Sequence, residues 1–345
     1  MGIKMNSQKL LELKTPMIYS YTILGTLFSI IEDKDMPWIY NNLIQIMYHD
    51  DWKMFIFEDQ INLLDKCPFI KTEYIIFDEN GQLNHSFIDA LIYIINNDYY
   101  VYLFLDWKCI VPNIIDHNFA HTTLISGYDK GRNIFYLSDN YDGGKFVTLE
   151  VDMDTVEKAF YSAWTSSVGN KNDNDGSEKF AYLKSITAFK YNKDVFTEFD
   201  RQGFVNQLKA FICSNSIYIL GEKGSKHHGY SSYDLIIEDL HGKNQLELGT
   251  KNFHLLYEHK HLMLKRVEFL ESKKIISSSH NYIEKVTELN NDFLKIRNLY
   301  IKSQLIDKSR KESVILNVCK KIELSKEKEK LLYEELIAEL DREAY

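Results

Sequence analysis

Apolar residues in the first half of the chain recur with helical spacing in some segments and as short runs in others. Residues 16–32 (PMIYSYTILGTLFSIIE) repeat apolar positions three and four apart, which predicts a helix buried over a broad face. Residues 86–96 show the same spacing, whereas residues 54–57 and 99–105 are typical of strands. Ser20 stands at the edge of the first helix, where an N-cap residue is expected. Further predicted elements are helices at 38–48 and 154–163, strands at 74–77, 146–151 and 181–191, and a polar loop at 168–177.

The segment from residue 121 to residue 139 (HTTLISGYDKGRNIFYLSD) has the pattern of a β-hairpin, because two apolar arms flank the polar turn DKGRN. Gly131 is expected to supply the positive φ of that turn. Folding back about Lys130 sets His121 directly opposite Asp139, with Cβ atoms roughly 5 Å apart. The carboxylate would then orient the imidazole, whereas a slip of one residue would send one of the two side chains to the other face.

Beyond about residue 195 the pattern becomes almost entirely helical. The last helix pairs Lys and Glu four residues apart, which indicates a solvated face. A chain of 345 residues suits two domains. We therefore predict an α+β domain over residues 1–194 and a helical domain over residues 195–345 that holds no sheet of its own. The predicted helices of the second domain cover residues 195–214, 233–240, 253–272, 282–303 and 313–340, with a loop at 217–229.

The amino-acid composition limits the classes of protein to which this chain can belong. Apolar residues make up 45% and charged residues 26%, as in globular proteins, and a net charge of −9 argues against a nucleic-acid binder. The four cysteines have no CxxC spacing, which fits a reducing compartment and excludes a conventional cysteine-rich zinc module. Neither a signal peptide nor a run of about 20 apolar residues is recognisable. We expect a cytoplasmic protein that binds neither a membrane nor a metal.

Ser20, His121 and Asp139 form the candidate catalytic set. A helix N-terminus carries partial positive charge and free N–H groups, which stabilise an anionic nucleophile and can receive an oxyanion. A base must touch the nucleophile, and a third group must orient the base. We therefore expect Ser20 Oγ within about 4 Å of a ring nitrogen of His121, with Asp139 at the other nitrogen. The chain order nucleophile, His, Asp is that of papain-like enzymes.

Each of these residues also has a structural interpretation. Ser20 can be a plain N-cap, His121 a hydrogen-bonded structural histidine, and Asp139 the residue that begins the turn at 140–144. Single residues therefore decide nothing, and the prediction depends on the three together.

Other residues are weaker candidates for the chemistry. His117 shares a face with His121 but lacks an acidic partner in the predicted register, and Cys109 opens no helix. Asp106, at the end of a buried strand, is expected to be structural. The pair at 227–228 (HH) has no third metal ligand at suitable spacing, so an exposed loop is expected there. Residues 221–226 do not match a P-loop, so no nucleotide site is expected there.

Short motifs spread over most of the chain are shared with one known family. They are SY at 20–21, LD at 105–106, HTTLISGYD at 121–129, FYLSDN at 135–140, DGGKF at 142–146, VEKAF at 156–160, GYSSYD at 229–234 and LYEHK at 256–260. On these motifs the first 190 or so residues resemble the papain-like, C39-peptidase-like domain of the butirosin biosynthesis protein H family. The helical half resembles the C-terminal partner domain of the same proteins.

The resemblance implies an amide-forming acyltransferase of nonribosomal peptide and polyketide pathways, that is, of antibiotic biosynthesis. The acyl donor would be a phosphopantetheine thioester on an acyl or peptidyl carrier protein, the acceptor a small-molecule amine, and no bound cofactor would be needed. Residue 20 would attack the thioester, His121 would take its proton and later remove one from the amine, and Asp139 would hold the His tautomer. The oligomeric state is left open, a homodimer included.

Two accessory roles follow from the same resemblance. Gln8 is a candidate for the side chain that stabilises the oxyanion beside backbone N–H groups. Both this chain and carrier proteins are acidic, so docking needs a local basic patch, for which Lys260, Lys265 and Arg266 are the candidates.

The chain departs from the family at the nucleophile, because position 20 holds Ser where the family has Cys. Three interpretations are open: a Cys-to-Ser replacement, a natural Ser nucleophile, and a catalytically inactive relative. A Ser hydroxyl is far less acidic than a thiol, whose pKa is about 8.5, and needs a stronger base. The same triad would also suit a peptidase or amidase, in which water resolves the acyl-enzyme. A non-catalytic binding module is the third alternative.

Overall fold

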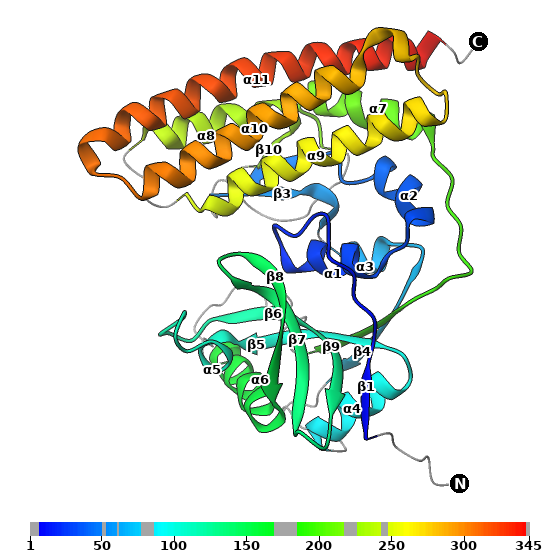
Figure 1. Cartoon of the computed structure of the whole chain (residues 1–345), viewed down its shortest axis with the longest axis vertical. Helices are drawn as coiled ribbons and strands as arrows, with labels where there is room; N and C mark the ends of the chain where they lie inside the picture. The colour runs from blue at the N-terminus through cyan, green and yellow to red at the C-terminus, as the bar shows by residue number, and fades with distance from the viewer. Residues whose placement is uncertain are drawn as a thin grey trace. The chain divides into compact units, whose positions relative to one another are not determined.

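A computed structural model describes residues 7–49, 53–60, 62–76, 86–168, 185–216, 226–242 and 248–342 (Figure 1). The chain forms two units, each from two stretches of sequence. Unit 1 contains Met1–Ile31 and Asn62–Phe196, and unit 2 contains Glu32–Ile61 and Thr197–Tyr345. The described residues mix an antiparallel sheet with helices, so the predicted α+β class is confirmed.

The later crossing between the units falls at Phe196, beside the boundary expected at 194/195. The segment Glu32–Ile61, which the sequence placed in the first domain, belongs instead to unit 2. Its strand Ile46–His49 pairs with a strand beyond residue 195, and such a long-range pairing leaves no local signal in the sequence.

The sheet of unit 1 is antiparallel, with the order β4-β9-β5-β6-β7-β8, and β1 pairs with β6 on the side of β5. The first half of β6 pairs with β5, and its last three residues pair with β1. The strands are β1 (Gln8–Leu10), β4 (Ile70–Ile76), β5 (Tyr100–Asp106), β6 (Ala120–Asp129), β7 (Ile134–Asp142), β8 (Lys145–Asp152) and β9 (Ser185–Tyr191).

Strands β6 and β7 form the predicted hairpin, but its turn differs from the prediction. The turn occupies residues 130–133 and closes with Asp129 opposite Ile134. Asn133, with φ of 56°, takes the left-handed conformation that the sequence assigned to Gly131. Asn tolerates this conformation better than most residues. The turn is therefore centred between residues 131 and 132, later in the chain than the expected centre at Lys130.

A β-bulge interrupts β6 at Ser126. Ile125 pairs with Leu137 and Gly127 with Tyr136, so Ser126 has no partner on β7. An extra residue shifts the pairing by one position. Side chains before the bulge therefore lie on the opposite face from the one that an uninterrupted strand would give them.

Strand β1 fits beside this bulge because residue 127 is glycine. A Cβ at Gly127 would lie 2.5 Å from the carbonyl oxygen of Lys9 and 2.8 Å from Cα of Leu10. The backbone N–H of Leu11 donates to the carbonyl of Ser126 at 2.8 Å. The bulge residue, unpaired on β7, thus continues the pairing with the N-terminal segment.

Helices α4 (Phe87–Asn96) and α6 (Met153–Val168) pack together and against β5. The rings of Phe87 and Phe160 stack with centroids 4.6 Å apart, within an apolar core shared with β5, β6 and β7. Helix α1 (Thr22–Ile30), predicted from its apolar spacing, contacts β6 and β7. Two short helices, α3 (Leu63–Lys66) and α5 (Trp107–Ile110), complete the described helices of this unit.

Unit 2 is a set of helices with a small sheet of its own. Helix α10 packs against α9 and α11, and α11 also contacts α7 and α8 (Figure 1). The three-stranded antiparallel sheet has the order β10-β2-β3. The elements are α2 (Met36–Asn41), β2 (Ile46–His49), β3 (Met54–Phe57), α7 (Arg201–Ile212), β10 (Lys226–His228), α8 (Ser232–His241), α9 (Thr250–Ser272), α10 (Tyr282–Gln304) and α11 (Lys308–Arg342).

The predicted helices of the second half form, but two predictions for this unit are wrong. The helix expected at 38–48 ends at Asn41, and Ile46–His49 is a strand buried along its whole length. A short apolar run of this kind cannot be told from a helix by its period. The expectation of no sheet beyond residue 195 fails at Lys226–His228. Val168, the first residue of the predicted loop at 168–177, ends α6, and the rest of that loop and most of the one at 217–229 lie outside the described residues. No described helix is long and apolar enough to cross a membrane.

A charged network lies in the core of unit 2. Lys260 is fully buried, and its ammonium donates to Tyr233 OH at 2.5 Å and to Nδ1 of His259 at 2.7 Å, and it pairs with the Glu329 carboxylate. The hydroxyls of Tyr233 and Tyr333 donate to the same carboxylate at 2.7 and 2.6 Å. Burial, opposed by Glu329, lowers the pKa of Lys260 to about 8. The ion pair is therefore structural, enclosed by hydrogen-bonding partners.

The basic patch predicted at Lys260, Lys265 and Arg266 is therefore wrong. Arg266 is also fully buried, and it donates to the carbonyls of Asn42 and Leu43 at 2.5 and 2.9 Å. Lys265 pairs with Glu268 at 2.8 Å. Helical spacing alone did not show that the cations at 260 and 266 lie on the inner face of α9.

Replacing Glu329 by Ala should destabilise the protein by about 3–5 kcal/mol, because it leaves the Lys260 charge buried without a partner. The matched control is Glu327→Ala on the exposed side of α11, where Glu327 accepts from Tyr230 OH at 2.5 Å. This control should cost no more than about 1 kcal/mol. Urea unfolding followed by circular dichroism measures both. Equal losses for the two variants would contradict the structural role of the buried pair.

Candidate active site

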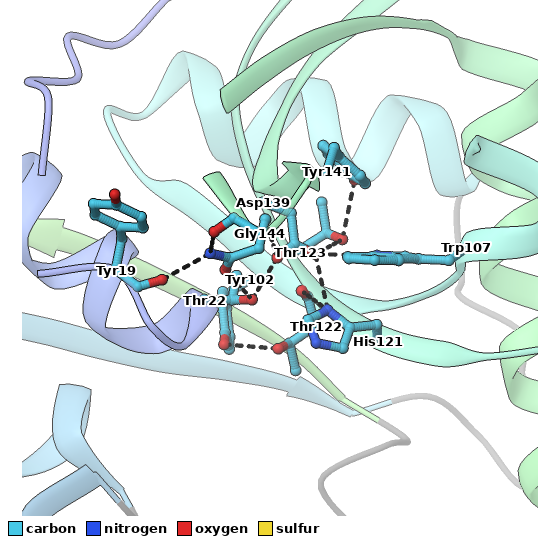
Figure 2. A network of polar contacts seen from close by, with 11 residues as sticks. Tyr19, Thr22, Tyr102, Trp107, His121, Thr122, Thr123, Asp139, Tyr141 and Gly144 are labelled. Carbon is cyan, nitrogen blue, oxygen red and sulfur yellow. Dashed lines mark hydrogen bonds and ion pairs between the residues drawn. The ribbon is translucent and has the colours of Figure 1, made fainter. Parts of the chain in front are cut away.

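A fully buried carboxylate, Asp139 on β7, is the centre of a polar network in unit 1 (Figure 2). Its Oδ2 accepts from Trp107 Nε1 and from Thr123 Oγ1, each at 3.1 Å, and lies 2.9 Å from Nδ1 of His121. Figure 2 shows Trp107 on one side of this carboxylate and Thr22 on the other.

The second oxygen, Oδ1 of Asp139, accepts from the hydroxyl of Thr22 and from the backbone N–H of Asn140, the latter at 2.7 Å. Together with Trp107 and Thr123, these groups surround the carboxylate with donors. A buried carboxylate is tolerated only when such donors replace water. The network therefore fixes both the position and the orientation of Asp139.

The contacts of His121 on β6 fix the orientation of its ring and define its tautomer. Its Nδ1 faces two acceptors, Oδ2 of Asp139 at 2.9 Å and the carbonyl of Thr122 at 3.0 Å. A nitrogen that faces only acceptors carries the proton, which leaves the lone pair on Nε2. The ring packs against Trp107, with centroids 4.5 Å apart, and stacks on Phe119 at 5.5 Å. The side chain is 20% exposed, so the ring is confined but not enclosed.

The structure brings His121 and Asp139 together, but not by the predicted pairing. The register beside the bulge, continued by one residue, sets Thr123 opposite Asp139 and leaves His121 diagonal to it on the same face. If Ser126 instead paired with Leu137 in an uninterrupted strand, Asp139 would face Leu124, and His121 would point to the other side of the sheet. The bulge is therefore a condition for the contact.

Hydrogen bonds of the residues on either side of Ser20 connect the start of α1 to this network. The side-chain amide of Asn140 donates to the carbonyl of Tyr19 at 2.7 Å. The hydroxyl of Thr22 donates to Asp139 (Figure 2). Ser20 itself is 3% exposed and lies one residue before the N-cap, so its N-cap interpretation is wrong. The first N–H groups of a helix have no intrahelical acceptor, and here they follow Ser20 directly. The approach of Ser20 Oγ to His121 stays a prediction.

Two tyrosines border the network. Tyr141 OH lies 3.3 Å from Oγ1 of Thr123, and Tyr102 OH donates to Oγ1 of Thr122 at 2.9 Å. Burial, followed by the negative charge of Asp139, raises the pKa of Tyr141 above its ordinary value. Burial likewise raises the pKa of Tyr102. Both phenols therefore stay protonated at neutral pH, which leaves His121 as the candidate base of this network.

Several rival candidates have other roles. His117 is exposed and its Nδ1 lies 3.1 Å from Asp116 on its own loop, so its acidic partner is not Asp139. Cys109 is the third residue of the one-turn helix α5, half-buried against the apolar core. The exposed loop expected for His228 is wrong, because this residue is on β10 with Nδ1 2.6 Å from the buried carboxylate of Glu58.

Gln8 is excluded as the oxyanion donor. It is exposed and pairs with Asp129, at the opposite end of β6 from His121. Eight residues of strand separate the two positions, which is roughly 26 Å. The side chains nearest to the start of α1 in the network are those of Thr22 and Asn140.

Asp106 has the structural role that the sequence predicted. It is buried, and Oδ1 accepts from the backbone N–H groups of Lys108 and Phe119 at 3.1 and 2.9 Å. Its Oδ2 accepts from Ser162 Oγ at 2.6 Å. Asp106 therefore anchors the segment whose Phe119 ring stacks on His121.

Sequence reasoning missed three partners of Asp139: Trp107, Thr123 and Thr22. One signal could have identified Thr123, because residues two apart on a strand share a face and Thr123 follows His121 by two. Trp107 and Thr22 come from elements distant in sequence, and no local pattern marks them.

No group of three or more His, Cys, Asp or Glu side chains that could hold a metal ion occurs in the part of the chain that the structure describes. In comparisons with known proteins, no protein-family model matches this chain. No curated protein matches it either.

Inserting one Ala between Thr123 and Leu124 should separate His121 from Asp139, because the insertion moves His121 one position along β6 and so to the other face of the sheet. Long-range ¹H–¹⁵N NMR of the histidine rings, with His121→Gln for assignment, measures the tautomer. The intact protein should show His121 with its proton on Nδ1, and the insertion variant a mixture of tautomers. Deleting Ser126 removes the bulge but keeps Ile125 opposite Leu137, so this control should leave the spectrum unchanged. A single Nδ1–H tautomer in the insertion variant would refute the dependence of the contact on the register.

Proposed function

We propose that this protein is a papain-like acyltransferase, in which residue 20, His121 and Asp139 move an acyl group from a thioester to an amine. One observation carries the proposal: a buried Asp139 holds His121 by Nδ1, and the same carboxylate accepts from Thr22, two residues after Ser20. Base, orienting acid and the helix start with its candidate nucleophile are thus joined in one network. A papain-like fold for unit 1 and a cytoplasmic location belong to the proposal.

The first half-reaction forms an acyl-enzyme. His121 Nε2 takes the proton of residue 20 as its side-chain oxygen, or sulfur in a Cys form, attacks the thioester carbonyl. The free N–H groups at the start of α1 stabilise the oxyanion. The C–S bond then breaks, and His121 returns the proton to the departing thiolate.

The second half-reaction forms the amide. The amine attacks the acyl-enzyme carbonyl, and His121 Nε2 accepts a proton from its nitrogen. The bond between the acyl carbon and residue 20 breaks, and His121 gives this proton back to residue 20. No proton or electron is gained or lost over the cycle, so neither a redox partner nor a nucleotide is needed.

Asp139 supports both steps without exchanging a proton itself. Its hydrogen bond to Nδ1 selects the tautomer with a free Nε2 and stabilises the imidazolium that forms in each half-reaction. The donors from Trp107, Thr123 and Thr22 hold the carboxylate in place when His121 changes charge. The rigid packing of the His121 ring against Trp107 preserves the alignment.

The identity of the donor and acceptor comes from the motif resemblance. The donor is a phosphopantetheine thioester on an acyl or peptidyl carrier protein, and the acceptor is a small amine in antibiotic biosynthesis. Serine at position 20 suits this reaction less well than cysteine. Transfer of an acyl group from one sulfur to another is near-isoenergetic. Transfer from sulfur to the Ser oxygen gives an ester and is not readily reversed. The proposal therefore expects low activity from the Ser form.

The test compares the Ser20 protein with Ser20→Cys, using acyl thioesters on a carrier protein, a panel of amines and no ATP. The Cys variant should form amide, detected by mass spectrometry, and should carry the acyl group on residue 20. The Ser form should be slower by about 100-fold or more, because its hydroxyl is less acidic. His121→Ala in the Ser20→Cys background should remove most of the gain.

Other outcomes separate the alternatives. Equal rates for the Ser and Cys forms would show that residue 20 is not the nucleophile. Release of free acid with amine present would indicate a hydrolase of the peptidase or amidase type. An acyl group that never appears on residue 20, with thioester or amine still bound, would indicate a catalytically inactive relative.

A further inference from the structure

Unit 2 has a basic groove between α10 and α11 that the proposed acyl transfer does not use. The groove has a volume of about 400 Å³. Its lining consists of Lys295, Asn298, Leu299 and Lys302 from α10 and Asn317 and Lys321 from α11. We call this set the α10–α11 groove.

Helical spacing explains how these side chains gather. Lys295, Asn298 and Lys302 are three and four residues apart on α10, and Asn317 and Lys321 are four apart on α11. Residues with these spacings share one face of a helix. Because α10 and α11 pack along each other, the two polar faces border the same groove.

Every charged residue in the lining is a lysine. Lys295 has only a distant partner, Asp292 at 3.6 Å, and Asp292 is also paired with Lys328 at 2.8 Å. Lys302 and Lys321 form no ion pair with any residue that the structure describes. The groove thus gathers positive charge in a chain whose net charge is −9. Neighbouring cations repel one another, and an anion between them would relieve that repulsion.

The lining chemistry selects the kind of anion. Ammonium groups are donors without acceptors, and the carboxamides of Asn298 and Asn317 can donate as well. Phosphate oxygens, with several acceptor positions and more than one charge, match this set. A volume of about 400 Å³ falls in the range of small-molecule sites, and Leu299 offers an apolar contact to an organic group.

We propose that the α10–α11 groove binds a soluble, phosphate-bearing compound with at least two negative charges. Lipid headgroups share this chemistry. A membrane surface, however, would call for a broad basic face, whereas here three lysines border one open, shallow groove. The proposal does not depend on the acyl-transfer function.

Calorimetric titration of the full-length protein with inorganic pyrophosphate, without divalent metal, tests this site. The protein should bind pyrophosphate, and binding should weaken as salt rises, because the contacts are between exposed charges. The double variant Lys302→Gln/Lys321→Gln should bind pyrophosphate about tenfold or more weakly, since each substitution removes one charge-assisted hydrogen bond. The matched control is Lys320→Gln, an exposed lysine on α11 outside the lining, which should change affinity by less than about twofold.

Each other outcome overturns the proposal. Absence of binding at low-millimolar pyrophosphate would exclude the site. An equal loss from Lys320→Gln and from the double variant would indicate a diffuse field and no site. Co-sedimentation with phosphatidylglycerol vesicles, without binding of soluble pyrophosphate, would indicate a membrane surface instead. Thermal unfolding of each variant verifies that the helices remain intact.

Discussion

Strand β6 carries one residue, Ser126, that has no partner on β7, and the candidate active site depends on that residue staying out of the pairing. The turn sets one register, and the bulge converts it to another before the strand reaches His121. The same residue accepts the backbone N–H of Leu11 through its carbonyl. Gly127 beside it leaves room for β1. This β-bulge therefore lets β6 pair with both β1 and β7, and it decides which face of the sheet His121 occupies.

The buried carboxylate of Asp139 joins elements that are far apart in sequence. Removing a carboxylate from water costs several kcal/mol of folding free energy unless hydrogen-bond donors surround it. The folded state must therefore bring these donors together. They come from the start of α1 (Thr22), from α5 (Trp107) and from β6 (Thr123). The stability of unit 1 and the position of the start of α1, which follows Ser20, thus depend on the same hydrogen bonds.

The sequence predicted much of this arrangement, and the failures have identifiable causes. Apolar spacing identified α1, α4 and the β6–β7 hairpin, and the hairpin led to the His121–Asp139 contact. The register was wrong in detail because Asn133 shapes the turn and a bulge leaves no signature in residue type. The assignment of Glu32–Ile61 to unit 2 and the burial of Lys260 arise from long-range packing, which periodicity within one segment does not encode.

The proposed chemistry requires residue 20 to lie within reach of His121 Nε2 at the start of α1. The pH dependence of iodoacetamide alkylation at residue 20 in Ser20→Cys, read by peptide mass spectrometry, measures this. An imidazolium and a helix N-terminus lower the pKa of a thiol well below the ordinary value of about 8.5. The thiol should therefore still be alkylated below about pH 7. Adding His121→Ala should abolish this reactivity at low pH. A thiol that titrates at about 8.5 or above, whether or not His121 is present, would contradict the proposed triad.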